Sequence, residues 1–315
     1  MQDQAIAFTT PPNAPRWQRW LVFSPLARII IFGLMLVAFS FALGGLFHVL
    51  GWGNRKGPAL SHAIADCLLR SVPALLAYLL LVRLVERRPV NELALRKLLP
   101  DAAKGILGGM LLFSTVVAVL YLLGSYHVTG IRPDASWLPA LLMVGLGAGI
   151  GEEIVARGVL FRITEEGLGT WVALIVSALF FGAAHIANPG ATLWSSAAIA
   201  IEAGLLFGLL YHVTRSLYVC MGLHAAWNFT QGTIYGIPVS GTKADGWLVS
   251  TRSGPDWLSG GIFGAEASVI ALALCLLCSA ALLMMALRRH GIVRPLAGRH
   301  VQTSGPLLSS SRPAG

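Results

Sequence analysis

The sequence predicts an all-α protein, a polytopic transmembrane helix bundle of about eight spans. Hydrophobic residues make up 56% of the 315-residue chain and charged residues only 12%, whereas a soluble domain carries about 25% charged residues. The mean hydropathy is +0.71. A chain of this length accommodates about eight helices of roughly 20 residues joined by short loops.

The spans are the apolar runs long enough to cross a bilayer. They fall at about 27–50, 62–83, 103–124, 136–163, 170–188, 193–213, 216–236 and 260–287. Pro73 is expected to kink the second span, because proline removes a helical hydrogen bond. Asp66 and Arg70 lie four residues apart in the same span, and we interpret them as a structural ion pair.

Composition divides the chain into six segments. They are an N-terminal cytoplasmic lead (1–26), the first helices with a basic cytoplasmic connection (27–99), a central helix bundle (100–236), an outer loop (237–259), a last transmembrane helix (260–290) and a cytoplasmic tail (291–315). The lead lacks the apolar run of a signal peptide. The tail is rich in Ser, Pro, Gly and Arg, which predicts disorder.

The net charge of +9 does not predict nucleic-acid binding, because the Lys and Arg residues are spread through short loops. With the N-terminus inside and eight spans, sixteen of the 23 Lys and Arg residues fall in cytoplasmic segments and five on the opposite side. The positive-inside rule therefore predicts a multi-pass protein of the inner (plasma) membrane with both termini in the cytoplasm. The lipid bilayer is the expected surrounding, and no nucleic-acid partner is expected.

Three charged side chains interrupt the apolar run that follows Trp137, namely Glu152, Glu153 and Arg157. A charge at membrane depth costs at least roughly 2.5–3.5 kcal/mol on insertion scales, so these groups need partners or a water-filled pocket. Glu153 and Arg157 are four residues apart and can pair on one helix face. Glu152 points about 100° away from Glu153, which leaves it as the carboxylate available for function.

Two further polar clusters lie in later spans: Phe181-Gly-Ala-Ala-His185 and His224-Ala-Ala-Trp-Asn228. His224 and Asn228 are four residues apart, so their polar groups share one helix face. At about 1.5 Å per residue, Glu152, His185 and Asn228 lie roughly 16–22 Å from the cytoplasmic ends of their helices. The three clusters therefore occupy one layer of the bilayer and predict a common interior site.

These residue types support two kinds of chemistry. A carboxylate and an imidazole that hold one water form a general-base arrangement. A second imidazole and a carboxamide would suit a developing oxyanion, which completes the parts for peptide hydrolysis without a serine nucleophile. The same side chains could instead bind a divalent metal such as zinc through Glu152, His185 and His224. No His-Glu-x-x-His occurs, which excludes a zincin-type site.

The ordered motifs Glu-Glu-x-x-x-Arg, Phe-x-x-x-His and His-x-x-x-Asn on successive membrane helices resemble the CPBP family (the ABI domain). That family comprises type II CAAX prenyl endopeptidases and bacteriocin-processing proteins. The resemblance covers about residues 100–236. The motifs are complete here as Glu152, Glu153, Arg157, Phe181, His185, His224 and Asn228.

The resemblance implies an intramembrane endopeptidase that cleaves a membrane-associated protein or peptide, either CAAX-type or like a bacteriocin precursor. It implies that Glu152 activates the water, that His185 helps to hold it, and that His224 and Asn228 stabilise the oxyanion. The family is described both as metalloprotease and as a metal-free glutamate type, so the expected cofactor is none or one divalent metal. We favour the metal-free form because Asn228 is a poor metal ligand and a good donor. The implied supporting residues are Glu153, Arg157 and Phe181.

Two other functions fit the same polar clusters. The chain could be a catalytically silent scaffold or immunity protein of the same fold, although its set of site residues is intact. It could also be a proton-coupled transporter with a carboxylate and histidine relay, although it lacks repeated halves. Glu202 lies outside the family motifs, and we interpret it as paired with a nearby polar group or as widening the polar cavity. Gly204-x-x-x-Gly208 predicts close helix packing.

Overall fold

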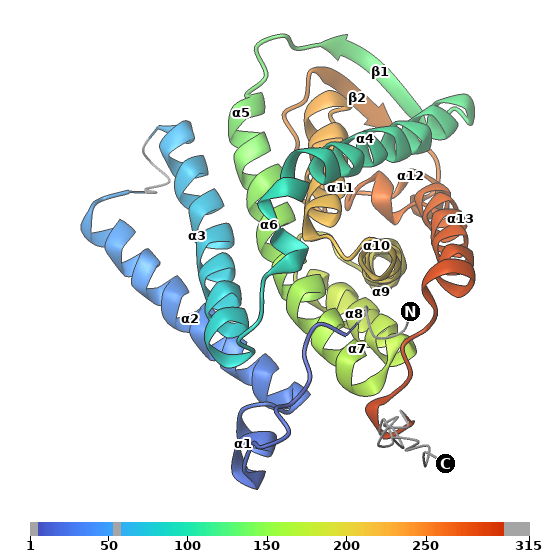
Figure 1. The fold of residues 1–315 in the computed structure, drawn as a ribbon. Coiled ribbons are helices and arrows are strands. Elements are labelled where there is room, and N and C mark those ends of the chain that lie inside the picture. Colours follow the sequence, from blue (N-terminus) through green and yellow to red (C-terminus); the bar gives the residue numbers. More distant parts are fainter. Residues whose placement is uncertain (1–5, 53–57, 299–315) are drawn as a thin grey trace, which may run out of the picture.

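The computed structural model describes residues 6–52 and 58–298 and forms a helix bundle with a small sheet at one end (Figure 1). The α-helices are α1 (Arg16–Leu21), α2 (Pro25–Val49), α3 (Ala59–Leu80), α4 (Leu98–Leu122), α5 (Trp137–Ala140), α6 (Ala148–Glu153), α7 (Arg162–Leu168), α8 (Thr170–His185), α9 (Leu193–Ile199), α10 (Leu206–Thr214), α11 (Leu217–Phe229), α12 (Asp256–Ser259) and α13 (Val269–Met285). The strands are β1 (Tyr126–Ile131) and β2 (Leu248–Arg252).

Several α-helices continue through stretches with wider turns, which are Leu81–Val85, Leu141–Gly147, Ile154–Phe161, Ala200–Leu205, Thr230–Ile234 and Ala286–His290. Tighter single turns form Asn91–Leu93, Leu95–Lys97, Ala265–Ala267 and Leu296–Gly298. Wide turns inside helices occur often at functional sites. Two of them, Leu141–Gly147 and Ile154–Phe161, flank Glu152 and Glu153 in one continuous helix.

The described residues contain six helices long and apolar enough to cross a membrane: Pro25–Val49, Ala59–Val85, Leu95–Leu122, Trp137–Leu168, Leu193–Thr214 and Val269–Arg289. The predicted polytopic helix bundle is thereby confirmed. The remaining two predicted spans correspond to the shorter helices α8 and α11. The last span begins later than the predicted residue 260, because Gly260, Gly261 and Gly264 have positive φ angles that a helix does not contain.

Helix α11 lies at the centre of the bundle, behind α4 and beside the helix that contains α6 (Figure 1). Nearly every residue of α11 is buried. Two glycines of α4 make this possible: a Cβ at Gly105 would collide with the backbone of Val219, and one at Gly109 with the backbone of Leu223. Small residues allow helix backbones to approach closely within membranes. The helix that carries His224 is therefore shielded on the α4 side.

The sheet joins two connections that are far apart in the sequence. Strand β1 pairs antiparallel with β2, from Tyr126 opposite Arg252 to Ile131 opposite Leu248, with an irregularity near Gly130. The sequence did not predict this sheet, since it assigned 237–259 to an outer loop. The sheet lies outside the spans and leaves the helical fold class unchanged.

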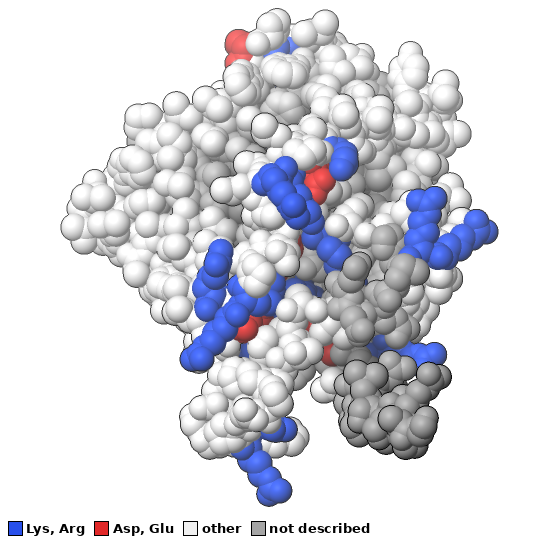
Figure 2. Space-filling view, in the orientation of Figure 1, with Lys and Arg blue, Asp and Glu red and all other residues white. Residues whose placement is uncertain are grey.

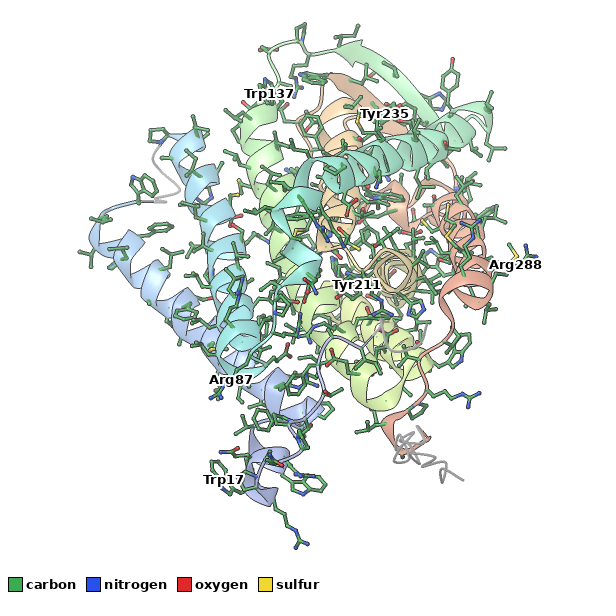
Figure 3. The ribbon with its side chains drawn as sticks, in the orientation of Figure 1. Trp17, Arg87, Trp137, Tyr211, Tyr235 and Arg288 are labelled. Carbon is green, nitrogen blue, oxygen red and sulfur yellow. The ribbon has the colours of Figure 1, made fainter. Side chains whose placement is uncertain are left out.

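The two ends of the bundle differ in charge. We call the end with α1 and α7 the α1 end, and the end with β1 and β2 the sheet end. Trp17 and Arg87 lie at the α1 end, and Trp137 and Tyr235 near the sheet end (Figure 3). On the face drawn in Figure 2, most Lys and Arg residues lie in the middle and lower parts, toward the α1 end. The predicted orientation, with both termini in the cytoplasm, depends on such an unequal distribution of Lys and Arg residues between the two ends.

A buried ion network holds the α1 end together. The Arg28 guanidinium contacts the carboxylates of Glu86 at 2.8 Å and Glu166 at 2.7 Å. Arg162 contacts the same two carboxylates at 3.0 Å each. All four side chains are at most 3% exposed. The network joins α2, α7 and the basic connection after α3.

Both terminal segments pack against this end where they are described. The Arg28 guanidinium lies 4.5 Å above the Phe8 ring of the N-terminal lead. The backbone N–H of Val293 donates to the Thr170 hydroxyl at 3.0 Å, so the first part of the predicted tail lies against the start of α8. The rest of that tail, from residue 299 onward, lies outside the described residues.

The Glu92 carboxylate makes stability at the α1 end depend on pH. Arg88 donates to both of its oxygens, at 2.7 and 3.0 Å, and Tyr78 donates a further hydrogen bond. Burial alone would raise the pKa of Glu92, but the bonds and charge of Arg88, with the charge of Arg162, lower that pKa from 4.5 to about 2.

Because the folded pKa of Glu92 lies below the unfolded one, its contribution is fully present above about pH 4.5 and is lost as the pH falls toward 2. We expect the thermal midpoint of the protein in detergent to fall across this range. The loss assigned to Glu92 is on the order of 3 kcal/mol. Glu92→Gln should lower the midpoint at pH 7 and flatten its fall with acid. An equally steep fall in that variant would contradict the assignment.

Candidate active site

The three polar clusters meet inside the bundle, on the Trp137–Leu168 helix, on α8 and on α11. Close packing brings α6 and α11 together, since a Cβ at Gly149 would lie 3.1 Å from the backbone nitrogen of Ala225. Likewise, a Cβ at Gly204 would collide with the backbone of Ala178 in α8. Close packing of the two helices therefore depends on this glycine, as the Gly204-x-x-x-Gly208 motif predicted. The shared layer expected from helix depths therefore exists as a set of side-chain contacts.

Glu153 and Arg157 form the predicted ion pair. Arg157 Nη1 donates to Glu153 Oε1 at 2.9 Å, and both side chains are completely buried. The guanidinium also donates to the carbonyl of Ala203 in the helix of α9 and α10. It lies 4.6 Å from the ring centroid of Phe181 and 5.0 Å from that of Phe207. These aromatic faces stabilise the cation where water is excluded.

The ring of His224 is oriented by this pair. Its Nδ1 lies 2.9 Å from Glu153 Oε1, the same oxygen that accepts from Arg157. A carboxylate can only accept, so Nδ1 carries the hydrogen. Nε2 then points away from Glu153, and it can donate a hydrogen bond only when the ring carries both protons.

Glu152 differs from Glu153 in its exposure and in its contacts. Its side chain is 35% exposed, and its Oε2 lies 4.0 Å from His224 Nε2. That separation exceeds hydrogen-bonding distance. Both atoms therefore remain able to bind a third group between the helices, as the spare carboxylate of the sequence was expected to do.

His185, at the end of α8, lies near His224 through the ring of Phe181, which contacts both histidines. Its Nδ1 lies 2.8 Å from the carbonyl oxygen of Phe181, which can only accept, so this nitrogen carries the hydrogen. The two rings are stacked with centroids 5.1 Å apart. Phe181 also contacts the His224 ring, at 6.2 Å between centroids. Nε2 of His185 is thus left as an acceptor that can hold a water.

Asn228 lies one turn beyond His224 on α11. Its Nδ2 donates to the backbone carbonyl of Val144 at 2.9 Å, which ties the amide to the wide-turn part of the Trp137–Leu168 helix. A carboxamide has two N–H hydrogens. One is used by Val144, and the second is available to another acceptor.

A pocket adjoins these side chains; its cavity volume is about 40 Å³, and the space including its opening to solvent is about 440 Å³. Its walls come from α8, α9, α10, α11, α13 and the segment before α13. It is lined by Phe181, His185, Ile199, Glu202, Ala203, Leu206, Phe207, His224, Trp227, Asn228, Ser240, Glu266 and Cys275. Four of the predicted site residues, Phe181, His185, His224 and Asn228, therefore line one pocket. Glu152 is not among its lining residues and lies 4.0 Å from His224.

The pocket also contains polar residues that were not assigned to the site from the sequence. Glu202 was expected either to be paired or to widen the cavity, and it lines the pocket. Ser240 and Glu266 come from the connection between α11 and α13, and Glu266 was not singled out. The sequence did contain a signal for Glu266. It is a carboxylate inside the predicted span 260–287, and burying its charge in the membrane is as costly as burying the charges in the other helices.

The positions of the predicted metal ligands Glu152, His185 and His224 show whether the three side chains could bind one metal ion. Within residues 6–52 and 58–298, no group of three or more His, Cys, Asp or Glu side chains is arranged to hold a metal ion. Both histidines leave Nε2 free, as metal-ligating histidines do. The three ligands nevertheless do not gather around one point, so we derive no catalytic step through a metal.

One family model matches the part of the chain in which the predicted site residues lie. Residues 134–230 match the family model described as type II CAAX prenyl endopeptidase Rce1-like. None of the curated proteins compared with the chain matches it. The matched range contains every motif residue of the predicted site and ends before Ser240 and Glu266.

Proposed function

Residues 134–230 belong to a CPBP-family domain of the type II CAAX prenyl endopeptidase kind. We infer that the protein is an intramembrane endopeptidase. It hydrolyses a peptide bond of a membrane-associated protein or peptide, of the CAAX or bacteriocin-precursor type. The observation that supports this proposal is that His185, His224 and Asn228 line one pocket and that Glu152 lies 4.0 Å from His224. A silent scaffold has no need of that arrangement.

In the proposed reaction, Glu152 is the general base. It takes a proton from a water that His185 holds through Nε2, and the water oxygen attacks the carbonyl carbon of the substrate. The carbon–nitrogen bond then breaks, and Glu152 returns its proton to the leaving nitrogen. The products are a carboxylic acid and an amine, which exchange the remaining proton to become a carboxylate and an ammonium group, and Glu152 is again ionised.

The negative charge on the carbonyl oxygen is stabilised from α11. Asn228 donates its second amide hydrogen, and His224 donates from Nε2 as an imidazolium. Such donors act on the charge that develops in the transition state and need no rearrangement during the reaction. Glu153 supports this role by accepting from Nδ1 of His224, and Arg157 keeps Glu153 in place.

The proposal is tested with the full-length protein reconstituted in lipid vesicles and a prenylated peptide substrate. We expect product formation that requires the wild-type protein. Absence of cleavage across CAAX-type and precursor-type peptides, with folded protein present, would contradict the proposed function. Uptake of peptide or proton movement without cleavage would instead favour the transporter interpretation.

Asn228→Ala is expected to lower kcat by roughly 10²–10³-fold with little change in KM, because one oxyanion donor is lost. It should also leave chelator sensitivity unchanged. For the wild-type protein we expect activity to resist chelators, since the proposed reaction uses no metal. If chelation abolishes activity and one divalent ion restores it, while His185→Ala no longer binds that ion, the metal-free mechanism is wrong but the peptidase assignment stands.

A further inference from the structure

Glu202 is a buried carboxylate that the proposed reaction does not use. It lies in the helix of α9 and α10 and is only 4% exposed, yet it lines the pocket. Its Oε1 has no hydrogen-bond partner among the described residues. A buried carboxylate is costly unless it is paired or hydrogen-bonded. A ligand that supplies the missing donor or charge would remove that cost.

Glu266 lies close enough to Glu202 for the two carboxylates to interact electrostatically. It is 2% exposed and reaches the same pocket from the segment before α13. Its Oε1 accepts from the backbone N–H and the hydroxyl of Ser240, both at 2.7 Å. The charge of Arg252 also acts on Glu266, and Arg252 donates to the carbonyl of Ser259. Glu266 is thus partly satisfied, whereas Glu202 is not.

Most of the other residues that line the pocket are apolar, among them Ile199, Leu206, Phe207 and Cys275. Long basic side chains bury an apolar stem and present a charged head. A carboxylate at the base of a pocket is also how trypsin selects a basic residue. The pocket combines an apolar lining with two carboxylates, and His185 and His224 line the same pocket.

Resting on the proposed function, we propose that Glu202 and Glu266 form a subsite that binds a lysine or arginine side chain of the substrate, close to the cleaved bond. The apolar wall contacts the stem, and Glu202 accepts from the cationic head. The substrate then supplies the hydrogen-bond donor that Glu202 Oε1 lacks in the free protein. The subsite determines which peptides are selected and takes no part in bond cleavage.

The test uses the full-length protein with Glu152→Gln, in which cleavage is expected to be slow on the time scale of a binding measurement, so binding is measured apart from activity. Peptides differ only by lysine or its uncharged isostere norleucine, placed at successive positions around the cleaved bond. At one position we expect the lysine peptide to bind about 10–100-fold more tightly, as for a buried charge pair. Adding Glu202→Gln should bring the ratio of the two dissociation constants to about one. Glu266→Gln should reduce it.

Asp101→Asn is the matched control, because it removes a carboxylate that pairs with Lys104 outside the pocket. It should retain the lysine preference. Equal binding of lysine and norleucine peptides at every position would overturn the subsite, as would a preference that survives both glutamate substitutions. Cleavage by the wild-type protein is followed in parallel. A lysine preference without any cleavage refutes the proposed function alone, and cleavage without a preference refutes the subsite alone.

Discussion

Glu152→Gln is expected to lower the rate of peptide hydrolysis by about 10²–10⁴-fold, the usual contribution of a general base. Gln has the size of Glu but cannot take a proton from water. The measurement is kcat for a membrane-associated peptide with the reconstituted protein. Glu153→Gln offers a useful contrast, because Glu153 contacts His224 and Arg157 rather than the reacting water.

The same substitution should leave the fold unaffected. Glu152 is 35% exposed on its side chain and has only a 4.0 Å contact with His224. We therefore expect a thermal midpoint close to that of the wild-type protein, since such substitutions usually change stability by no more than about 0.5 kcal/mol. Activity within tenfold of wild type would remove Glu152 from the role of base.

Arg157→Ala should act on stability rather than on chemistry. It leaves Glu153 as a buried charge without its cation and also removes the contacts with the Phe181 and Phe207 rings. Breaking a buried pair in this way costs about 3–5 kcal/mol. The expected result is a large loss of monodisperse folded protein and a lower thermal midpoint in detergent.

Arg70→Ala is the matched control for Arg157→Ala. Arg70 pairs with Asp66 at the same four-residue spacing and at 2.7 Å, but its side chain is 51% exposed. An exposed pair contributes about 0–1 kcal/mol. Equal losses in the two variants would show that burial does not determine the strength of the Glu153–Arg157 pair.

The sequence was sufficient to predict the features that depend on local residue spacing or on the cost of burying a charged side chain. The i,i+4 spacing of Glu153 and Arg157 predicted their contact, and apolar run lengths predicted the helices. The depth of each cluster along its own helix predicted that the three clusters share one layer of the bilayer, and His185, His224 and Asn228 line one pocket. The contacts between Phe181 and both histidines follow from that convergence.

Features that depend on non-local pairing could not be predicted in the same way. Strand β1 pairs with β2 more than a hundred residues later, and no periodicity within either strand identifies its partner. Glu266 reaches the pocket only because Gly260, Gly261 and Gly264 delay the start of α13. The wide turns on either side of Glu153 likewise depend on tertiary packing rather than on local propensity.

The contacts of Arg157 also constrain how the protein is made. This one guanidinium binds a carboxylate on its own helix and a backbone carbonyl at Ala203, and the carboxylate binds His224 on α11. Ala203 and His224 are translated well after Arg157. The nascent helix therefore enters the membrane with a cation whose later partners do not yet exist, and its insertion depends on Glu153 alone. The centre is completed only when α11 arrives, so truncation before that helix should expose the intermediate to quality-control proteolysis.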